Sequence, residues 1–421
     1  MRTPRVIAAA AIALVVVPTA WAQGGKVTVG YRTPAALCGL EVVQRVDSLH
    51  VAQVRTGSVA KLRQRPGIEW VRRTAVRERA AEPALVPWTA GAVPEWQWTA
   101  TRSDLVPASV QRAAQRVTIA VVDTGADVTA PDLASKGATL HNVVTQGEDV
   151  TDTVGHGTFV ASLAAGSVTN GDGIAGFGGD ARLMVVQASR HGGTFSDVDE
   201  AAAIVWAVDH GARIVNLSLG GTTTSRAERQ AIAYATSKGV LLVAAAGNRG
   251  PRADSVEYPA ALLGDSGLVV AASTPSGERA EFSSVGRQID VAAPGLNVLG
   301  ALSSTSPESV FPRIALPGAS AGLYGFGSGT SYAAPQVAGT AALVWAANPS
   351  LTAKDVATII RETATGGGSW TSGLGYGVID AAAAVTRAGL VTASPLAAAK
   401  PVTAKVKKRP AHARRPARSK R

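Results

Sequence analysis

Short apolar runs rich in β-branched residues alternate with Ala-rich segments of helical periodicity from residue 117 onward. The runs predict strands over residues 117–122, 182–186, 213–217, 240–245 and 268–271. Strands that are apolar along their whole length, with helices between them, are typical of a parallel sheet covered on both faces. We therefore predict a doubly wound α/β domain whose ligands bind beyond the carboxyl ends of its strands.

Three helices of this domain have readable local signals. We expect one over residues 156–165, one over residues 331–347 with Pro335 near its start, and one that begins at Thr352. The third has the spacing of a capping box, because Asp355 follows Thr352 by three residues. Beyond Gly389 the sequence becomes Ala, Pro, Lys and Arg without periodicity, and we predict a disordered tail over residues 389–421.

A smaller α/β unit precedes the large domain. The pattern predicts strands over residues 26–31, 49–54 and 67–71 and a short helix over residues 58–64. From Arg77 to Val93 the pattern gives way to Ala, Pro, Glu and Arg, which is typical of an exposed connector. We place the domain boundary there, so that residues 23–94 form one unit and residues 95–388 the next.

The first 22 residues have the features of a secretory signal peptide. Arg2 and Arg5 precede an apolar run over residues 6–17, and Ala20-Trp21-Ala22 is a small-x-small cleavage site. An uncleaved membrane anchor is the alternative, although the run is shorter than the about 20 residues of a spanning helix. Cys38 is the only cysteine of the 421 residues, which excludes an internal disulfide and a multi-cysteine zinc site. We expect an exported protein.

Charge is distributed unevenly along the chain. The formal net charge is +11, but residues 392–421 alone carry +10, with ten basic residues and no acid. Residues 23–94 carry +6 and residues 95–391 carry −7. The net charge therefore describes the ends of the chain rather than a basic binding face on the main domain.

Three polar segments lie at the ends of predicted strands or at the starts of predicted helices. Asp123 follows the first strand of the large domain and precedes Thr124-Gly125, His156 stands between two glycines at a helix start, and Ser331 begins a helix after Gly327-Ser328-Gly329-Thr330. Each has an ordinary structural explanation when taken alone, as a turn carboxylate, a capping histidine or a helix N-cap. Together they supply a hydroxyl nucleophile, its general base and the acid that orients the base.

With these motifs in the chain order Asp, His, Ser, the sequence resembles the subtilisin-like serine peptidases over residues 95–388. The resemblance implies that Asn248, in Ala245-Ala246-Gly247-Asn248, donates to the oxyanion together with the main-chain N–H of Ser331. It also implies a substrate-binding strand, with Gly193 and Thr194 at its opposite edge. The residues of that strand are Ser218, Leu219 and Gly220.

Two further roles rest on the resemblance. Glu257, just before Tyr258-Pro259, matches a position near the floor of the pocket for the residue on the acyl side of the cut bond, where a carboxylate would favour Lys or Arg. An exposed loop glutamate is the alternative. Asp132 and Asn170 match two ligands of a calcium site of the family, although Ala130 stands where the family has His. Acidic residues that simply face water are the alternative there.

The remaining segments suggest partners. By resemblance, residues 23–94 are an inhibitory prosegment that is cut away, and its charge of +6 complements the domain at −7. The basic tail either solubilises the chain, binds an anionic cell-envelope polymer or membrane, or folds back on the acidic domain; nucleic acid does not fit an exported protein. An insertion over residues 302–323 either lines the cleft or lies on the surface.

The sequence thus predicts a secreted serine endopeptidase, retained at the cell envelope if the tail binds there, that acts on proteins or peptides and needs no cofactor for its chemistry. An esterase is disfavoured, because Ser331 does not lie in a Gly-x-Ser-x-Gly elbow. A catalytically silent envelope-binding protein of the same fold is the remaining alternative.

Overall fold

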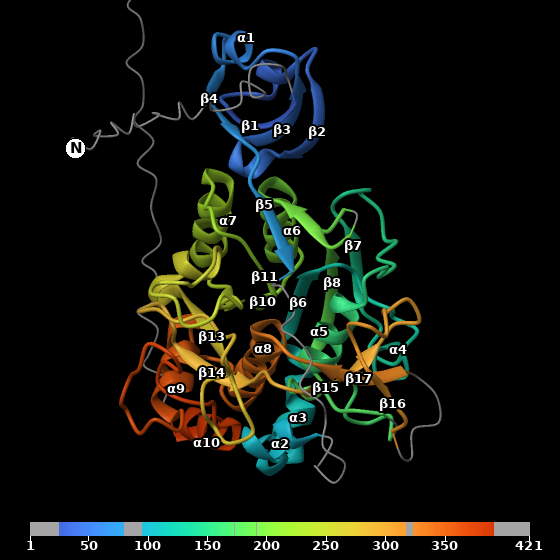
Figure 1. Cartoon of the computed structure of the whole chain (residues 1–421), viewed down its shortest axis with the longest axis vertical. Helices are drawn as coiled ribbons and strands as arrows, with labels where there is room; N and C mark the ends of the chain where they lie inside the picture. The colour runs from blue at the N-terminus through green and yellow to red at the C-terminus, as the bar shows by residue number, and fades with distance from the viewer. Residues whose placement is uncertain (1–24, 80–94, 172, 191, 317–322, 391–421) are drawn as a thin grey trace, which may run out of the picture. The chain divides into compact units, whose positions relative to one another are not determined.

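Two sheets, one large and parallel and one small and antiparallel, organise the computed structural model (Figure 1). The structure describes residues 25–79, 95–171, 173–190, 192–316 and 323–390. The predicted signal peptide, most of the predicted connector and residues 391–421 of the predicted tail lie outside the described residues.

The large sheet has seven strands in the order β14-β13-β12-β10-β6-β8-β7, and every neighbouring pair is parallel. Its strands are β6 (Thr118–Asp123), β7 (Thr139–Asn142), β8 (Arg182–Gln187), β10 (Ile214–Leu217), β12 (Leu241–Ala245), β13 (Gly267–Ser273) and β14 (Val291–Pro294). The five apolar runs of the sequence correspond to β6, β8, β10, β12 and β13, so the predicted doubly wound α/β fold is confirmed.

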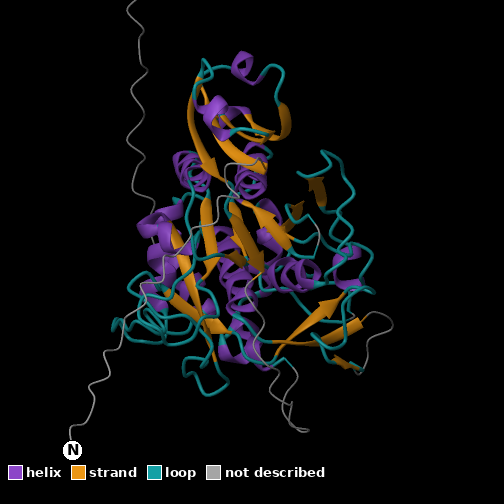
Figure 2. Cartoon of the chain, turned by 45° about the horizontal axis from the view of Figure 1, so that its top comes forward, coloured by secondary structure: helices purple, strands orange, loops and turns teal. Residues whose placement is uncertain are grey.

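Helices cover both faces of this sheet (Figure 2). Along β6, Ile119 and Val121 pack with α5 and α8, whereas Ala120 and Val122 pack with α6 and α7, as the alternation of side chains along a strand requires. The helices around the sheet are α4 (Pro131–Ala134), α5 (His156–Ala165), α6 (Asp197–Asp209), α7 (Arg226–Ser237), α8 (Thr330–Ala347), α9 (Ala353–Thr363) and α10 (Ala381–Leu390). The predicted capping box at the start of α9 is present, and α10 continues two residues beyond the predicted end of the domain at residue 388.

The helix α8 runs through the centre of the domain. Its residues are buried from Thr330 to Trp345, in keeping with a helix that is apolar on all sides. Pro335 lies inside α8 and has no N–H to donate to the carbonyl of Ser331, four residues earlier. The start of α8 therefore has a main-chain acceptor that a side chain from another element can reach.

The N-terminal sheet has the strand order β2-β3-β1-β4, and all its pairs are antiparallel. Its elements are β1 (Gly25–Tyr31), β2 (Glu41–Val46), β3 (Val51–Thr56), α1 (Val59–Arg63) and β4 (Ile68–Arg73). The strand β2 has no clear apolar alternation and the sequence analysis missed it. Residues Val46, Leu49 and Val51 share an apolar cluster with α6 and α7, so these two helices lie between the N-terminal sheet and the large sheet (Figure 1).

A strand stands where an exposed connector was expected. The strand β5 (Val76–Arg79) pairs antiparallel with both β11 (Leu219–Gly220) and β9 (Thr194–Ser196), giving a three-stranded sheet in the order β11-β5-β9. Residues 77–79 therefore belong to a strand, and the expectation of exposure was wrong at Arg77, which is buried. The sequence of this strand is polar, so it was not recognised as a strand. Its arginine, Arg77, is buried because it pairs with carboxylates of two helices that are distant in the sequence.

The predicted insertion over residues 302–323 contributes to the core. Its Phe311 is fully buried and stacks on Phe159 of α5 at a ring-centroid distance of 5.5 Å. The surrounding strands are β15 (Val298–Leu302), β16 (Arg313–Ile314) and β17 (Leu323–Gly327), in the order β15-β17-β16. The short helices α2 (Trp96–Ala100) and α3 (Ala108–Ala113) complete the domain. None of the helices formed by the described residues combines the length and apolar character needed to cross a bilayer.

Candidate active site

The carboxylate of Asp123 stands at the carboxyl end of β6, in the middle of the large sheet. Its Oδ1 accepts a hydrogen bond from the N–H of Thr124 at 2.7 Å and lies 2.7 Å from Nδ1 of His156. Both side chains are buried, with 1% and 0% of their surface exposed. Because an ionised carboxylate can only accept, this contact holds the proton of a neutral imidazole on Nδ1 and leaves Nε2 as the basic nitrogen.

His156 is the first residue of α5, and the two glycines beside it are required by their surroundings. A Cβ on Gly155 would collide with Ser306, and a Cβ on Gly157 would collide with the carbonyl of Gly125 and approach Asp123. The two glycines therefore allow His156, Asp123 and Ser306 to lie close together.

A residue that the sequence analysis missed fixes the start of α5. Asp152 is 2% exposed, and its Oδ1 accepts from the N–H groups of Val154 and Gly155 and from the hydroxyl of Thr124. Its Oδ2 accepts from the N–H and the hydroxyl of Thr158. Asp152 thereby links the loop after Asp123 to the helix of His156. Its position four residues before the histidine, at a helix start, was the available signal.

Ser331 lies in the first turn of α8 and is bonded to Ser218, which follows β10. The hydroxyl of Ser218 donates to the carbonyl of Ser331 at 2.8 Å, and the hydroxyl of Ser331 donates to the carbonyl of Ser218 at 3.3 Å. The Ser218 hydroxyl also accepts from the side chain of Asn216 at 2.9 Å. These bonds fix the beginning of α8 against the end of β10.

The helices of His156 and Ser331 pack against each other. Tyr332, the residue after Ser331, has its ring centroid 5.7 Å from that of His156. The structure thus brings Asp123, His156 and the start of α8 to one edge of the sheet.

Asn248 joins them from the end of β12. Its Oδ1 accepts from both the N–H and the hydroxyl of Thr330, each at 2.9 Å, so the orientation of its amide is set by the residue before Ser331. The amide nitrogen lies toward Gly329, where an added Cβ would be only 3.2 Å from it. A hydrogen-bond donor is therefore held beside the start of α8.

The predicted substrate-binding strand is already paired. Glu78 of β5 lies opposite Gly220 on one side and opposite Thr194 on the other, and Arg79 lies opposite Leu219. Gly193, predicted with Thr194 as the second edge, precedes β9 and is not itself in this ladder. The space between β11 and β9 is therefore occupied by an extended segment of the same chain, β5.

Arg77 of β5 enters a buried acidic pocket that sequence reasoning missed. Its Nε and Nη2 donate to Oε1 of Glu228 at 3.0 and 2.6 Å, and its Nε lies 3.3 Å from Oε2 of Glu200. All three side chains have 0% of their surface exposed. Burial opposes the charge of Arg77, but the two carboxylates prevail and its pKa is raised. The only signal in the sequence was a Glu three residues after Ser225, which indicated a helix start.

Glu257 lies between the strand edge and the loop of Asn248. A Cβ added to Gly220 or to Gly247 would meet its side chain, which is 12% exposed. Burial raises the pKa of Glu257, which the charge of Arg249 lowers in part, with the two side chains 3.9 Å apart. The carboxylate thus lies against Gly220 of the predicted substrate-binding strand rather than in an exposed loop.

The two residues predicted to bind calcium lie on adjacent loops, because Nδ2 of Asn170 donates to the carbonyl of Pro131 at 3.3 Å. Asp132 is fully buried, and its oxygens accept from the N–H of Ile174 and the hydroxyl of Tyr324.

Glu95 lies close by and was missed by the sequence analysis. Burial, together with the charge of Asp132, raises its pKa to about 7, and its Oε1 is buried without a hydrogen-bond partner. A hard cation would stabilise an unsatisfied carboxylate oxygen that feels the charge of a second carboxylate, and this supports a calcium site here. No group of three His, Cys, Asp or Glu side chains suited to a metal occurs in the described part of the chain.

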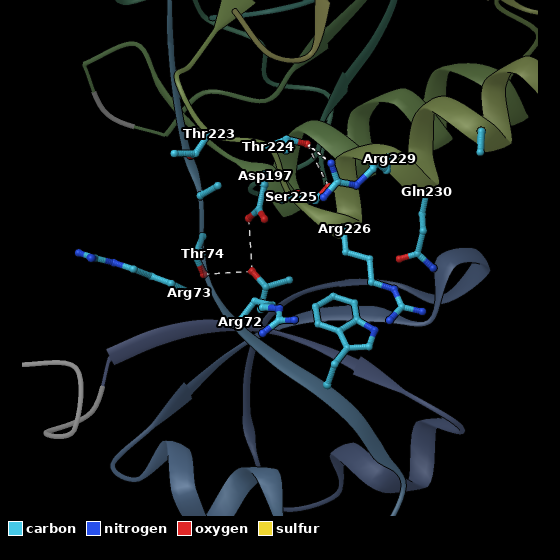
Figure 3. Close-up of a pocket in the computed structure, with 14 residues that line it drawn as sticks. Arg72, Arg73, Thr74, Asp197, Thr223, Thr224, Ser225, Arg226, Arg229 and Gln230 are labelled. Carbon is cyan, nitrogen blue, oxygen red and sulfur yellow. Dashed lines mark hydrogen bonds between the residues drawn. The ribbon is translucent and has the colours of Figure 1, made fainter. Parts of the chain in front are cut away.

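Contacts around the start of α6 continue the interface with the N-terminal sheet (Figure 3). Asp197 accepts from the hydroxyl of Thr28 at 3.3 Å, and its N–H donates to the carbonyl of Ala75 at 2.9 Å. These residues border a pocket of about 720 Å³ between β4 and the start of α7. Burial raises the pKa of Asp197 to about 6, against the hydrogen bonds and the charge of Arg77, which lower it.

Comparison with known proteins gives consistent matches. A model described as the subtilase family matches residues 114–377. M-protease of Shouchella clausii (strain KSM-K16) is 38% identical over 269 residues, which are 64% of this chain and 64% of that protein. Subtilisin Savinase of Lederbergia lenta is 38% identical over 269 residues, 64% of this chain and 90% of that protein.

The fold is similar to that of fervidolysin from Fervidobacterium pennivorans, described as a keratinolytic enzyme related to subtilisin. The TM-score is 0.74 at 24% identity, and the similarity covers 86% of this chain and 61% of that one. The matches thus span less than two thirds of M-protease and of fervidolysin.

Proposed function

The chain belongs to the subtilase family, and from this premise we propose that it is a serine endopeptidase that hydrolyses peptide bonds of protein substrates. The contact of 2.7 Å between Nδ1 of His156 and Asp123, at the sheet edge that also holds Ser331, is the observation that carries the proposal.

In this mechanism Ser331 is the nucleophile, His156 the general base and Asp123 the orienting acid. Nε2 of His156 takes the hydroxyl proton as Oγ of Ser331 attacks the scissile carbonyl, and later gives it to the leaving amine. The resulting imidazolium is stabilised by Asp123. Water then attacks the acyl-enzyme with the same base, which releases the acid product and restores Ser331.

The negative oxygen formed during attack needs donors. We assign this role to Nδ2 of Asn248 and the main-chain N–H of Ser331. The fixed orientation of the Asn248 amide supports the assignment, because a donor held by Thr330 needs no reorganisation during the reaction.

Substrate binds as an added strand between β11 and β9, with Ser218, Leu219 and Gly220 on one edge and Thr194 after Gly193 on the other. Main-chain hydrogen bonds would give affinity with little demand on sequence. The ladder formed by β5 supports this mode.

We assign residues 23–94 the role of an inhibitory prosegment. It would block the enzyme by placing β5 where substrate binds, and the complementary charges would favour its docking. The division into prosegment and peptidase domain at residues 94 and 95 remains a prediction.

For the residue on the acyl side of the cut bond, we propose a preference for Lys or Arg. The carboxylate of Glu257 beside Gly220 and Gly247 supports it. Calcium has a structural role in the proposal and takes no part in the chemistry. Asp132 and Asn170 would hold it, with Glu95 alongside.

Export through residues 1–22, and retention at the cell envelope through the tail, stay predictions from the sequence. An envelope polymer remains a proposed partner of residues 389–421 on the ground of their charge alone.

Labelling by a serine-directed fluorophosphonate tests the function. We expect the full chain, after processing, to be labelled and to hydrolyse casein, and the Ser331→Ala chain to do neither. A folded, processed protein that resists the label and cleaves no peptide would instead support the catalytically silent binding protein.

A further inference from the structure

Two glutamates from different helices meet in one buried pocket beside the substrate edge. Glu200 lies in the first turn of α6 and Glu228 in the first turn of α7, and both are fully buried. Oε2 of Glu228 accepts from the hydroxyl of Thr224 and closes the capping box of α7. The other oxygen, Oε1, faces Arg77.

Glu200 has no comparable local role. Neither of its carboxylate oxygens has a hydrogen-bond partner in the described structure, and the cation beside it is Arg77. Burial first, and then the charge of Glu228, raises the pKa of Glu200 well above its usual value. A buried carboxylate of this kind is strongly unfavourable unless a cation compensates it.

The compensating cation comes from β5, which by the proposed function leaves the cleft when the enzyme matures. Once β5 has left, the pocket would hold the carboxylates of Glu200 and Glu228 without the positive charge of Arg77. A substrate strand bound in the same ladder would then bring a side chain to the place of Arg77.

The register of the ladder fixes which substrate residue this is. Arg79 lies opposite Leu219, so a strand that continues in register places its next residue opposite Ser218. The carbonyl of Ser218 is 3.3 Å from the hydroxyl of Ser331. The residue opposite Ser218 is therefore the one whose carbonyl is attacked, and the residue in the acidic pocket stands three positions before it.

We propose that Glu200 and Glu228 form a specificity pocket for arginine at the fourth residue on the acyl side of the cut bond. This inference rests on the proposed peptidase function and names the class of substrate it acts on. Substrates are thus selected at two places, by Glu257 next to the cut and by this pocket three residues away.

The geometry favours arginine over lysine. Two guanidinium nitrogens contact Glu228 while one of them, Nε, also lies beside Glu200. A lysine ammonium is a single point charge and cannot reproduce this planar fork. The Cα of Gly221 lines the arginine stem, because a Cβ there would be 3.2 Å from Cδ of Arg77.

A peptide series on the processed wild-type enzyme tests the proposal. The parent peptide has the sequence of residues 74–84 with Arg79→Gln and Ala80→Arg, so that every peptide carries the same arginine next to the intended cut. Only cleavage after position 80, identified by mass spectrometry of the products, is counted. At the position of Arg77 it carries Arg, Lys, norleucine or Gln. We expect kcat/KM to fall about 10- to 100-fold from Arg to norleucine, with Lys between them. A Gln at the exposed position of Glu78 is the matched control and should change kcat/KM less than about twofold.

Variants of the pocket test it from the enzyme side. In Glu200→Gln and Glu228→Gln, the ratio of kcat/KM between the Arg and norleucine peptides should fall by about tenfold. Glu362→Gln, an exposed glutamate of α9, should keep the wild-type ratio. Fluorophosphonate titration corrects each rate for the amount of active enzyme.

The outcomes separate the two proposals. An enzyme that takes the label and cleaves the Arg and norleucine peptides equally well overturns the arginine pocket and leaves the peptidase function intact. A wild-type ratio retained in both Gln variants also overturns it. Absence of both labelling and cleavage overturns the peptidase function itself. If the Gln variants do not mature, the peptide series on the wild-type enzyme still tests the arginine pocket.

Discussion

The hydroxyl of Ser218 donates a hydrogen bond of 2.8 Å to the main-chain carbonyl of Ser331. Pro335 cannot bond to this carbonyl, because it has no N–H, and so a side chain at the sheet edge takes that place. One residue thereby joins the substrate edge to the helix that presents the proposed nucleophile.

Removal of this link should affect both stability and activity. In Ser218→Ala, we expect the free energy of unfolding to fall by about 1–2 kcal/mol, because the buried carbonyl of Ser331 loses a donor. The value of kcat should fall as well, since α8 is less firmly placed. Chemical denaturation and peptide kinetics measure the two effects. Ser276→Ala, at an exposed loop, is the control, and equal behaviour of the two variants would contradict the prediction.

Asp152 should act on catalysis through His156. In Asp152→Asn, the amide nitrogen cannot accept hydrogen bonds, so either the Thr158 pair or the Val154–Gly155 group of bonds is lost. We expect kcat to fall about 10- to 100-fold, because hydrogen bonds that position the base are lost. The change in KM should be smaller, because, among the described residues, Asp152 does not contact the strands that would bind substrate. Steady-state kinetics with active-site titration checks this. A rise in KM at constant kcat would assign Asp152 to substrate binding instead.

The carboxyl of Asp197 should make stability depend on pH. Burial raises its pKa from the ordinary 3.8 to about 6, so the folded state disfavours its ionised form. Its contribution to stability is therefore largest below pH 3.8 and is lost as the pH rises through 6.

Comparison with a residue that cannot ionise tests this. In the Ser331→Ala background, which would prevent self-cleavage, Asp197→Asn should gain in Tm relative to the parent as the pH is raised from 4 to 7. Parallel Tm curves for the two proteins over this range would show that Asp197 does not titrate as inferred.

Glu257 should set the preference next to the cut. In the register of β5, position 80 is the residue next to the cut. Among peptides with Arg, Ala or Phe at this position, the wild type should have the highest kcat/KM for the Arg peptide. In Glu257→Gln, the ratio of kcat/KM for Arg over Phe should fall about tenfold or more, because a charge-assisted hydrogen bond is lost. Faster cleavage of the Phe peptide than of the Arg peptide by the wild type would reject the role of Glu257.

Calcium should stabilise the fold without entering the chemistry. At a concentration one hundred times the Kd, a bound ion adds about 2.7 kcal/mol to the stability. We expect Tm to rise with added calcium, to fall with a chelator, and to be insensitive to both in Asp132→Asn. The parent chain with magnesium in place of calcium is the control. If calcium does not change the Tm of the parent chain, the proposed calcium site is wrong.

Local patterns accounted for the scaffold. The apolar runs predicted five strands of the large sheet, since a strand buried on both faces must be apolar along its length, and the helix starts at His156 and Thr352 were readable from neighbouring residues. The pattern failed at β2 and β5. In β5 the buried residue is an arginine, which looks like part of an exposed linker until its partners are known.

The pattern of the chain was enough to predict the fold class and, through the order of Asp123, His156 and Ser331, the family resemblance. The contacts of Arg77 with Glu200 and Glu228 became apparent only in the folded chain. The physical reason is that short-range patterns record which residues are apolar and how elements begin, whereas a buried charge is stable only through its partners. Glu228 stands 151 residues after Arg77 in the chain, and packing of α6 and α7 against the sheet is what brings the three side chains together.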